Sequence, residues 1–410
     1  MTGLILATVA ILGGIGGLLT AYQYYRYSMQ WQRNHVPPTR WPHVTVIAPH
    51  RGPIIRECVD ALLAQDYAGT WNIIFATTHK DASYPQLADH ATRHEHVQVV
   101  LTDDVVQLAK EKSIHRGQKN HNLVTALSKV SPETEVIAVI DSDVCPSPDW
   151  LNTLVEPLSD ADDRLGATTL ARFYVPGSGL ASCAQATWIL GSAALMVGPW
   201  GYVWGGSFAM RREILEKTDV LDRWKGLKGS ISSDDLNLSV ALRLGHYRVS
   251  YVPGHKALRS PPKEGETWSD VLRFTNRQLL HTWWSRRDLW LAAFMTEGMK
   301  SIALLGALGI AWLQPVALLA LCVPILDILR FSLVVAALRS LDSSNRPFLH
   351  SQQKAILAAG PLPSLLCIIN TVAAATRTHM EWGGVKYTYR TVVGYTEDDS
   401  WRARTTGKPD

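Results

Sequence analysis

Apolar residues gather near the two ends of the chain, whereas the middle alternates short apolar runs with polar stretches. Residues Leu4 to Ala21 form an uncharged run rich in Leu, Ile, Ala and Gly. At the rise of an α-helix this run is long enough to cross the hydrocarbon core of a bilayer. Neither a basic n-region nor a small-residue cleavage site accompanies it, so we interpret residues 1–25 as a transmembrane anchor and not as a cleaved signal peptide.

Two further apolar zones lie toward the carboxyl end. The first runs from Ser301 to Leu338 and contains Pro315, and a proline inside such a zone ends or kinks a helix. We therefore predict a transmembrane hairpin over 299–340. The second zone, 353–378, carries Gly360-Pro361-Leu362-Pro363 near its start. Its prolines leave two interpretations open, a spanning helix and a re-entrant one.

Strand-like and helix-like stretches alternate over residues 42–256, which is typical of an α/β fold with a mostly parallel sheet. Val44 to Ala48, Asn72 to Ala76 and Val97 to Leu101 are the expected early strands. Between the first two, Ile55 to Ala64 repeats apolar residues at helical spacing. This order predicts a nucleotide-binding sheet whose loops gather at one edge.

The triplet Asp141-Ser142-Asp143 directly follows the apolar run from Val136 to Ile140. That run is rich in β-branched residues, as is typical of a strand buried on both faces. Its two acids therefore stand at the carboxyl edge of a strand, where open α/β sheets bind ligands. Two acids one residue apart can hold a divalent cation against a diphosphate. A solvated turn is the alternative, because Asp and Ser are also common turn formers.

Charge and cysteine content indicate which binding partners and which cellular compartment to expect. The net charge of +4 is small for 410 residues, and no stripe of basic residues interleaved with aromatics indicates a nucleic acid partner. The basic residues Arg339, Arg346 and Lys354 indicate a loop on the cytoplasmic side, so we expect a multi-pass integral membrane protein whose middle lies on the cytoplasmic face. The five cysteines are scattered and lack metal-ligand or redox spacing, which favours a reducing compartment.

Several motifs occur in the order found in membrane-bound family 2 glycosyltransferases. They are Pro49 to Tyr84, Gly117 to Leu123, Asp141-Ser142-Asp143, Gly205 to Arg212, Ser233-Asp234-Asp235 and Asn276-Arg277-Gln278. The chain most resembles the ceramide glucosyltransferase branch and its bacterial lipid-glycosylating relatives, and Glu381 to Tyr387 is similar to the tail of that branch. The resemblance implies a GT-A nucleotide-diphospho-sugar transferase domain with a Rossmann-like, mostly parallel sheet, plus transmembrane and interfacial helices.

Sugar transfer from a nucleotide diphosphate needs a held diphosphate, stabilisation of the departing charge and a base for the acceptor hydroxyl. By the resemblance, Asp143 coordinates Mg²⁺ or Mn²⁺ between the phosphates, while Asp141 contacts the nucleotide. Asp81 follows the second strand and matches an aspartate that lies near the uridine in the family. Its alternative role is to cap the turn before Ala82 and Ser83.

The resemblance makes Asp235 the general base, because it matches the last acid of the Thr-Glu-Asp motif of the family. A single displacement with this base inverts the anomeric centre. The same segment also fits the start of a helix, with Ser232 or Ser233 as the N-cap. Both roles are compatible, since a carboxylate in the first turn of a helix is held rigidly.

Three more positions are assigned to the substrates. Arg277 matches the diphosphate-clamping arginine of the Gln/Arg-x-x-Arg-Trp motif, although an interfacial snorkelling arginine is the alternative. Gln278 and Phe274 replace the usual Trp and Gln or Arg, so the acceptor geometry of the family does not carry over. Lys119 is expected to reach the phosphates, and Gly206 to let the backbone approach the donor sugar. Turn chemistry is the alternative for both.

Together these features predict an inverting, metal-dependent hexosyltransferase. It moves glucose from UDP-glucose onto a membrane lipid hydroxyl at the cytoplasmic face and produces a glycolipid. A processive polysaccharide synthase and a catalytically inactive membrane scaffold are the alternatives. The remaining parts are expected to be interfacial helices over 257–298 and a polar tail over 379–410.

Overall fold

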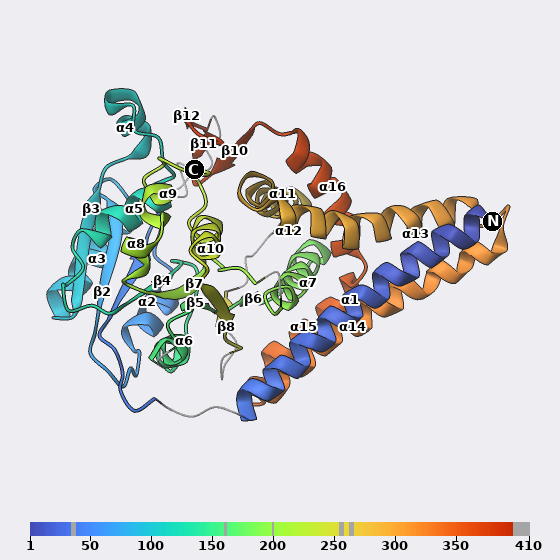
Figure 1. The fold of residues 1–410 in the computed structure, drawn as a ribbon, viewed down its shortest axis with the longest axis horizontal. Helices are drawn as coiled ribbons and strands as arrows, with labels where there is room; N and C mark the ends of the chain where they lie inside the picture. The colour runs from blue at the N-terminus through green and yellow to red at the C-terminus, as the bar shows by residue number, and fades with distance from the viewer. Residues whose placement is uncertain (34–37, 160–161, 199–200, 254–257, 262–265, 397–410) are drawn as a thin grey trace. The chain divides into compact units, whose positions relative to one another are not determined.

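The computed structural model describes residues 1–33, 38–159, 162–198, 201–253, 258–261 and 266–396 (Figure 1). The chain divides into two compact units. The sheet unit comprises Val36–Arg172, Tyr202–Gly254 and Thr378–Asp410, and the helix unit comprises Met1–His35, Phe173–Gly201 and His255–Arg377. The domain predicted over 42–256 therefore differs from the sheet unit, because Phe173–Gly201 joins the helix unit. The boundary predicted at 256 and 257 lies outside the described residues.

Within the described residues, a seven-stranded sheet in the order β3-β2-β1-β4-β7-β5-β8 forms the centre of the sheet unit. These strands are β1 Val44–Pro49, β2 Trp71–Thr78, β3 Val97–Thr102, β4 Val136–Ile140, β5 Leu165–Thr169, β7 Ser207–Arg211 and β8 Arg248–Tyr251. Only β7 runs antiparallel to its neighbours β4 and β5 in this sheet. All residues of β1 and β4 are buried, as expected for strands covered on both faces. The predicted α/β fold with a mostly parallel sheet is confirmed.

Helices connect these strands and supply the apolar side chains that pack on them. They are α2 Arg56–Leu63, α3 Tyr84–Arg93, α4 Val105–Lys112, α5 Gln118–Leu127, α6 Trp150–Ser159, α8 Ile214–Lys217, α9 Val220–Trp224 and α10 Asp235–Leu244. Leu123 of α5, Trp224 of α9 and Leu238 of α10 share one buried cluster with sheet residues such as Val139 and Phe208. The starts of α5 and α10 are thereby fixed against the sheet.

Long apolar helices dominate the helix unit. In Figure 1, α1 (Thr2–Arg33) runs alongside α13 (Met299–Ile310) and α14 (Val323–Leu341). Ala7 and Ala10 of α1 pack against Ala303 and Ala307 of α13, and such small residues let helices approach closely. Three helical stretches of the described chain are long and apolar enough to cross a membrane: Thr2–Arg33, Arg287–Ile310 and Pro315–Leu341.

The rest of the helix unit includes the predicted interfacial segment and the third apolar zone. Its other elements are β6 Arg172–Tyr174, α7 Leu180–Ala194, β9 Leu258–Ser260, α11 Trp268–Ser285, α12 Arg287–Ala293, η1 Phe294–Gly298, η2 Pro315–Cys322, α15 Arg346–Ala359 and α16 Leu362–Thr376. The first residue of β6, Arg172, belongs to the sheet unit. Helices α15 and α16 meet at an angle of 71°. This bend is compatible with both interpretations of 353–378, a broken spanning helix and a re-entrant segment.

Two sequence expectations change. Cys58 and Cys145 form a disulfide across 87 residues, whereas Cys183, Cys322 and Cys367 are free. The cysteine spacing did not predict this pairing, because Cys58 and Cys145 are far apart in sequence and meet only in the folded chain. Residues 379–395 of the predicted polar tail form a small antiparallel sheet of β10 His379–Trp382, β11 Val385–Thr388 and β12 Val392–Tyr395. Residues 397–410 of that tail lie outside the described residues.

Candidate active site

The carboxyl end of β4 presents Asp141 and Asp143 in a tight turn. The amide of Asp141 donates to the carbonyl of Gly206 at 3.1 Å, and Val144 N donates to the carbonyl of Asp141 at 3.2 Å. The side chains of Asp141 and Asp143 are 27% and 34% exposed. The triplet is therefore a turn, and its carboxylates are accessible at the edge of the sheet where α/β folds bind ligands.

Lys119 in the first turn of α5 joins three separate segments of the chain. Its Nζ lies 2.7 Å from Oδ1 of Asp141 and 2.8 Å from Oδ2 of Asp234, and it donates to the carbonyl of Gly205 at 2.8 Å. An ammonium group has three hydrogens, so these three acceptors match its capacity. The position of Lys119 at the phosphates stays a prediction, and in this structure its contacts are with the protein.

The charges around Lys119 perturb one another. Burial acts to lower the pKa of Lys119, but the carboxylates of Asp141 and Asp234 outweigh it and raise that pKa above its usual range. Burial raises the pKa of the Asp234 carboxyl from 3.8 to about 7, with Lys119 opposing the shift and Asp235 and Asp141 adding to it. The ammonium therefore stays charged, whereas the buried Asp234 titrates near neutral pH.

Asp235 begins α10 and is held on both carboxylate oxygens. Oδ2 accepts from the amide of Gly205 at 2.9 Å, and Oδ1 accepts from Ser233 Oγ and Leu236 N, both at 2.7 Å. Ser233 Oγ also accepts from Leu236 N at 3.1 Å, so this hydroxyl serves the first turn of the helix. A helix does begin in this segment as predicted, but its N-cap residue is Asp234 and not Ser232 or Ser233. These hydrogen bonds fix the position of the Asp235 carboxylate. Its role as a base stays a prediction.

Arg172 is a site residue that the sequence analysis missed. Its Nη1 donates to Oδ1 of Asp143 at 2.6 Å, and its guanidinium lies 5.1 Å from the centre of the Trp204 ring. The side chain is only 8% exposed. A charged residue inside the otherwise uncharged stretch from Gly166 to Tyr174 is the sequence signal that marks it, since a charge among buried residues needs a partner.

Asp81 and Gly206 have clear local roles. The carboxylate of Asp81 accepts from Gly52 N at 3.0 Å and from Ser83 Oγ at 2.7 Å, which ties the loop after β1 to the loop after β2. Gly52 has φ +91°, a conformation that favours glycine. A Cβ at Gly206 would lie 1.9 Å from the Trp204 ring, so this glycine makes room for the tryptophan. The contacts of Asp81 with uridine and of Gly206 with the donor sugar stay predictions.

Arg277 and Gln278 lie on α11 of the helix unit. The Arg277 guanidinium stands 5.6 Å from the centre of the Phe274 ring, which meets Tyr174 and Trp188 edge-on. Phe274 therefore belongs to an aromatic cluster inside the helix unit. The assignment of Arg277 and Gln278 to the substrates stays a prediction.

Comparison with known proteins identifies the family. A family model described as "Glycosyltransferase like family 2" matches residues 40–280, more than half of the chain. The chain belongs to this family. It is accordingly a glycosyltransferase, and its sheet unit has the GT-A fold. None of the curated protein sequences matches the chain significantly.

Several solved structures share features of this family 2 glycosyltransferase at low identity. The mannosyltransferase PcManGT from Pyrobaculum calidifontis, in complex with GDP-Man and Mn²⁺, is 19% identical, with 90% of this chain and 97% of that chain covered and a TM-score of 0.45. Glucosyl-3-phosphoglycerate synthase from Mycobacterium tuberculosis, in complex with Mn²⁺, UDP and phosphoglyceric acid, is 16% identical, with 58% and 78% covered and a TM-score of 0.35.

Asp143, the predicted metal ligand, and Asp141 offer accessible carboxylate oxygens at the end of β4. Their oxygen donors match the preference of Mg²⁺ and Mn²⁺. Across the described ranges, no group of three or more His, Cys, Asp or Glu residues is arranged to hold a metal. A cation at Asp143 would therefore need further ligands from outside the protein, such as water or phosphate oxygens.

The carboxyl-terminal sheet of this family 2 enzyme forms hydrogen bonds with two segments of the site, the start of α5 and the loop before α10. The buried Tyr387 hydroxyl accepts from Gln118 N, at the start of α5, at 3.4 Å. The carbonyl of Tyr389 accepts from Ile231 N at 3.2 Å, and Arg390 donates to the carbonyl of Gly229 at 2.9 Å. The segments that lead to Lys119 and to Asp234 are thereby tied to β11 and its turn. Sequence reasoning missed this because the partners are distant along the chain.

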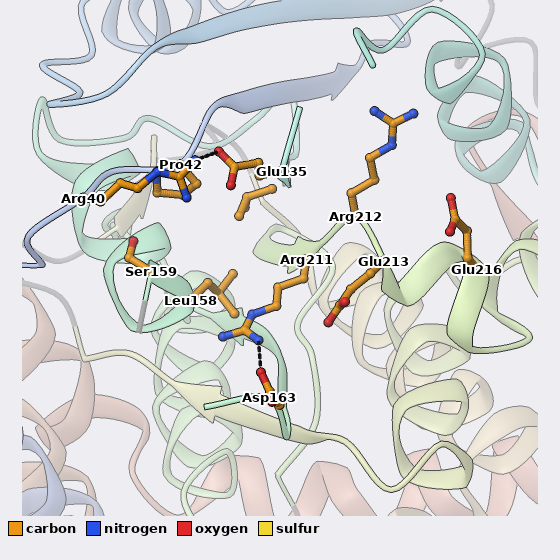
Figure 2. A pocket seen from close by; sticks show the side chains of 11 residues that line it. Arg40, Pro42, Glu135, Leu158, Ser159, Asp163, Arg211, Arg212, Glu213 and Glu216 are labelled. Atoms are coloured by element: carbon orange, nitrogen blue, oxygen red, sulfur yellow. Dashed lines mark hydrogen bonds and ion pairs between the residues drawn. The ribbon is translucent and has the colours of Figure 1, made fainter. Parts of the chain in front are cut away.

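A cavity of about 450 Å³ lies at the amino end of β4, whereas Asp141 follows the carboxyl end of that strand. It is lined by Val136, the first residue of β4, and by charged side chains on neighbouring segments. Figure 2 shows two ion pairs there, Arg40 with Glu135 at 2.7 Å and Arg211 with Asp163 at 3.9 Å. None of the predicted substrate-binding residues lines this cavity.

Proposed function

We propose that this glycosyltransferase transfers glucose from UDP-glucose to the hydroxyl of a membrane lipid by an inverting single displacement that requires Mg²⁺ or Mn²⁺. The observation that carries the proposal is the contact of Lys119 with Asp141 and Asp234 at the carboxyl edge of the sheet. This contact joins the acids assigned to the donor with the loop that bears Asp235, the acid assigned to the acceptor.

The donor half of the reaction belongs to the turn after β4. Asp143 would hold the cation, which when bound neutralises the charge that builds on the departing diphosphate. Asp141 remains fixed by Lys119 and faces the nucleotide. The rigid turn positions these groups before the donor arrives, so little reorganisation accompanies the reaction.

Asp235 serves the acceptor. Its carboxylate takes the proton of the lipid hydroxyl as that oxygen bonds to the anomeric carbon, and the bond from this carbon to the phosphate oxygen breaks with its electron pair leaving on UDP. The amide of Gly205 holds Oδ2 in place at 2.9 Å, yet a carboxylate oxygen can accept a second hydrogen bond. The first turn of α10 keeps the base from rotating away.

The apolar helices support a lipid acceptor. An enzyme with helices long enough to cross a bilayer is held where lipid hydroxyls are presented at the interface. With the positive loop predicted on the inner side, the reaction is proposed at the cytoplasmic face.

The test uses the purified full-length protein in lipid nanodiscs with UDP-glucose, Mn²⁺ and extracted membrane lipids. Release of UDP and a lipid heavier by one hexose in the mass spectrum are expected. Asp235→Asn should abolish both, whereas Asp89→Asn, a change at an exposed acid of α3, should abolish neither. Full UDP release by Asp235→Asn contradicts the assignment of the base. A long polymer as product contradicts the lipid acceptor, and absence of sugar transfer from any nucleotide sugar favours the scaffold.

A further inference from the structure

Arg172 forms an ion pair with Asp143, the carboxylate predicted to bind the divalent cation. Nη1 of Arg172 and Oδ1 of Asp143 are 2.6 Å apart, a distance typical of a charge-assisted hydrogen bond. Arg172 is almost fully buried, whereas Asp143 keeps 34% of its side chain exposed. The accessible partner of the pair is therefore the carboxylate, which a solute cation can reach.

Trp204 provides Arg172 with a second contact that does not depend on Asp143. The guanidinium lies 5.1 Å from the ring centre, within the range of a cation–π interaction. The ring is itself fixed, because it lies against Gly206 and because Trp204 N donates to Thr169 Oγ1 at 3.0 Å. Arg172 therefore keeps its contact with the Trp204 ring when Asp143 binds another cation.

The charges of the site favour an exchange of partners. In this turn Asp141 pairs with Lys119, whereas Asp143 pairs with Arg172, so each carboxylate has a basic residue of the protein beside it. A divalent cation bound by Asp143 competes with Arg172 for the same carboxylate. Released from Asp143, the guanidinium of Arg172 could donate to a diphosphate, a ligand that would match its planar set of donors.

We propose that Arg172 is a substrate-binding residue that neutralises Asp143 in the free enzyme and turns to the nucleotide diphosphate when a divalent cation takes the carboxylate. This inference rests on the proposed function, since it concerns the same donor site. It also predicts effects of opposite sign on two ligands. Removing Arg172 frees Asp143 for the metal but deprives the diphosphate of a donor.

The experiment measures two affinities of the full-length protein in nanodiscs. Binding of Mn²⁺ alone is followed by the electron paramagnetic resonance signal of free Mn²⁺, and binding of UDP at saturating Mn²⁺ by calorimetry. In Arg172→Gln, Mn²⁺ alone should bind more tightly and UDP should bind about tenfold more weakly, the loss expected for one hydrogen bond to a charged group. Arg172→Lys, which keeps the charge but not the planar fork, should hold Mn²⁺ like the wild type and lose part of the UDP affinity.

A matched control is Arg248→Gln on β8, where the side chain is 65% exposed and pairs with Asp162. It should leave both affinities unchanged. If Arg172→Gln does not fold, as judged by its thermal transition, Arg172→Lys alone decides through its UDP affinity. Weakening of both ligands, or no change in either, overturns the role of Arg172. A wild-type protein that binds neither Mn²⁺ nor UDP refutes the proposed function itself.

Discussion

Nζ of Lys119 and Oδ1 of Asp141 lie 2.7 Å apart, and this contact joins the first turn of α5 to the turn after β4. The lysine side chain is only 10% exposed, and its ammonium also meets Asp234. A buried charge is costly unless it is paired, so each of these three groups depends on the others. Lys119 thus holds the turn after β4 and the loop that bears Asp234 in one geometry.

Replacing Lys119 should damage both stability and binding. In Lys119→Met, the buried Asp234 and the partly exposed Asp141 lose their counter-charge, and breaking a buried pair costs about 3–5 kcal/mol. We expect a clearly lower melting temperature and UDP-glucose turnover reduced at least about 100-fold, because a misplaced catalytic group commonly costs this much. Thermal unfolding and UDP release measure the two effects.

The matched control is Lys129→Met, just past the other end of α5, where the side chain is exposed. It should change neither the melting temperature nor turnover. Lys119→Arg keeps the charge and should retain part of the stability. Wild-type melting and turnover in Lys119→Met contradict a central role for this ammonium.

Asp234 should make stability depend on pH near neutrality. Burial raises the pKa of its carboxyl to about 7 from 3.8. Between pH 4 and 7 the folded protein therefore holds a proton that the unfolded chain releases, so stability falls as pH rises, by at most about 1.4 kcal/mol per pH unit. Asp234→Asn cannot titrate and should remove this slope.

Melting temperatures of the wild type and of Asp234→Asn between pH 5 and 7 measure the slope. Asp222→Asn, at an acid whose side chain is 46% exposed, is the control and should keep the wild-type slope. Identical slopes in the wild type and in Asp234→Asn mean that Asp234 is ionised throughout this range.

The local parts of the fold and site follow from the sequence, and the long-range parts do not. The apolar run from Val136 to Ile140 determines both the strand and the position of Asp141, because a strand is specified by consecutive residues. The partner of Cys145 is Cys58, 87 residues away, and the partner of Asp143 is Arg172 on another strand. Such pairs depend on strand order and register, which hydrophobic periodicity does not encode.

The hydrogen bond between Tyr387 of the carboxyl-terminal sheet and Gln118 of α5 can be tested by substitution. Burial raises the pKa of Tyr387 to about 12, so the phenol is neutral, and its oxygen accepts from Gln118 N. Tyr387→Phe leaves that buried amide without its acceptor at a cost of about 1–3 kcal/mol. We expect faster hydrogen exchange at residues 113–118 and a lower melting temperature.

Tyr389→Phe is the control for the hydrogen bond of Tyr387. Tyr389 is 39% exposed, and its carbonyl, which accepts from Ile231 N, is unaffected by the substitution. Exchange at 113–118 should match the wild type in this variant. Equal exchange rates in Tyr387→Phe and Tyr389→Phe contradict the contribution of the Tyr387 hydroxyl.

The helix unit contains a buried ionic network that fixes its apolar helices together. Nζ of Lys300 on α13 lies 2.6 Å from Oδ1 of Asp327 on α14 and 2.8 Å from Oε2 of Glu297. Arg330 pairs with Glu297 as well, and Ser364 of α16 donates to Glu297 Oε2 at 2.7 Å. Two acids thus face two bases, and charged groups buried among apolar helices are stable only when they are paired.

Lys300→Met should therefore destabilise the full-length protein in nanodiscs by about 3–5 kcal/mol, because two carboxylates then share one Arg330. Adding Asp327→Asn restores the balance of charge, so the double variant should melt above the single one, which a double-mutant cycle quantifies. Lys354→Met, at an exposed position of α15, is the matched control and should melt like the wild type. A single variant that melts like this control shows that Lys300 is not needed to balance the network.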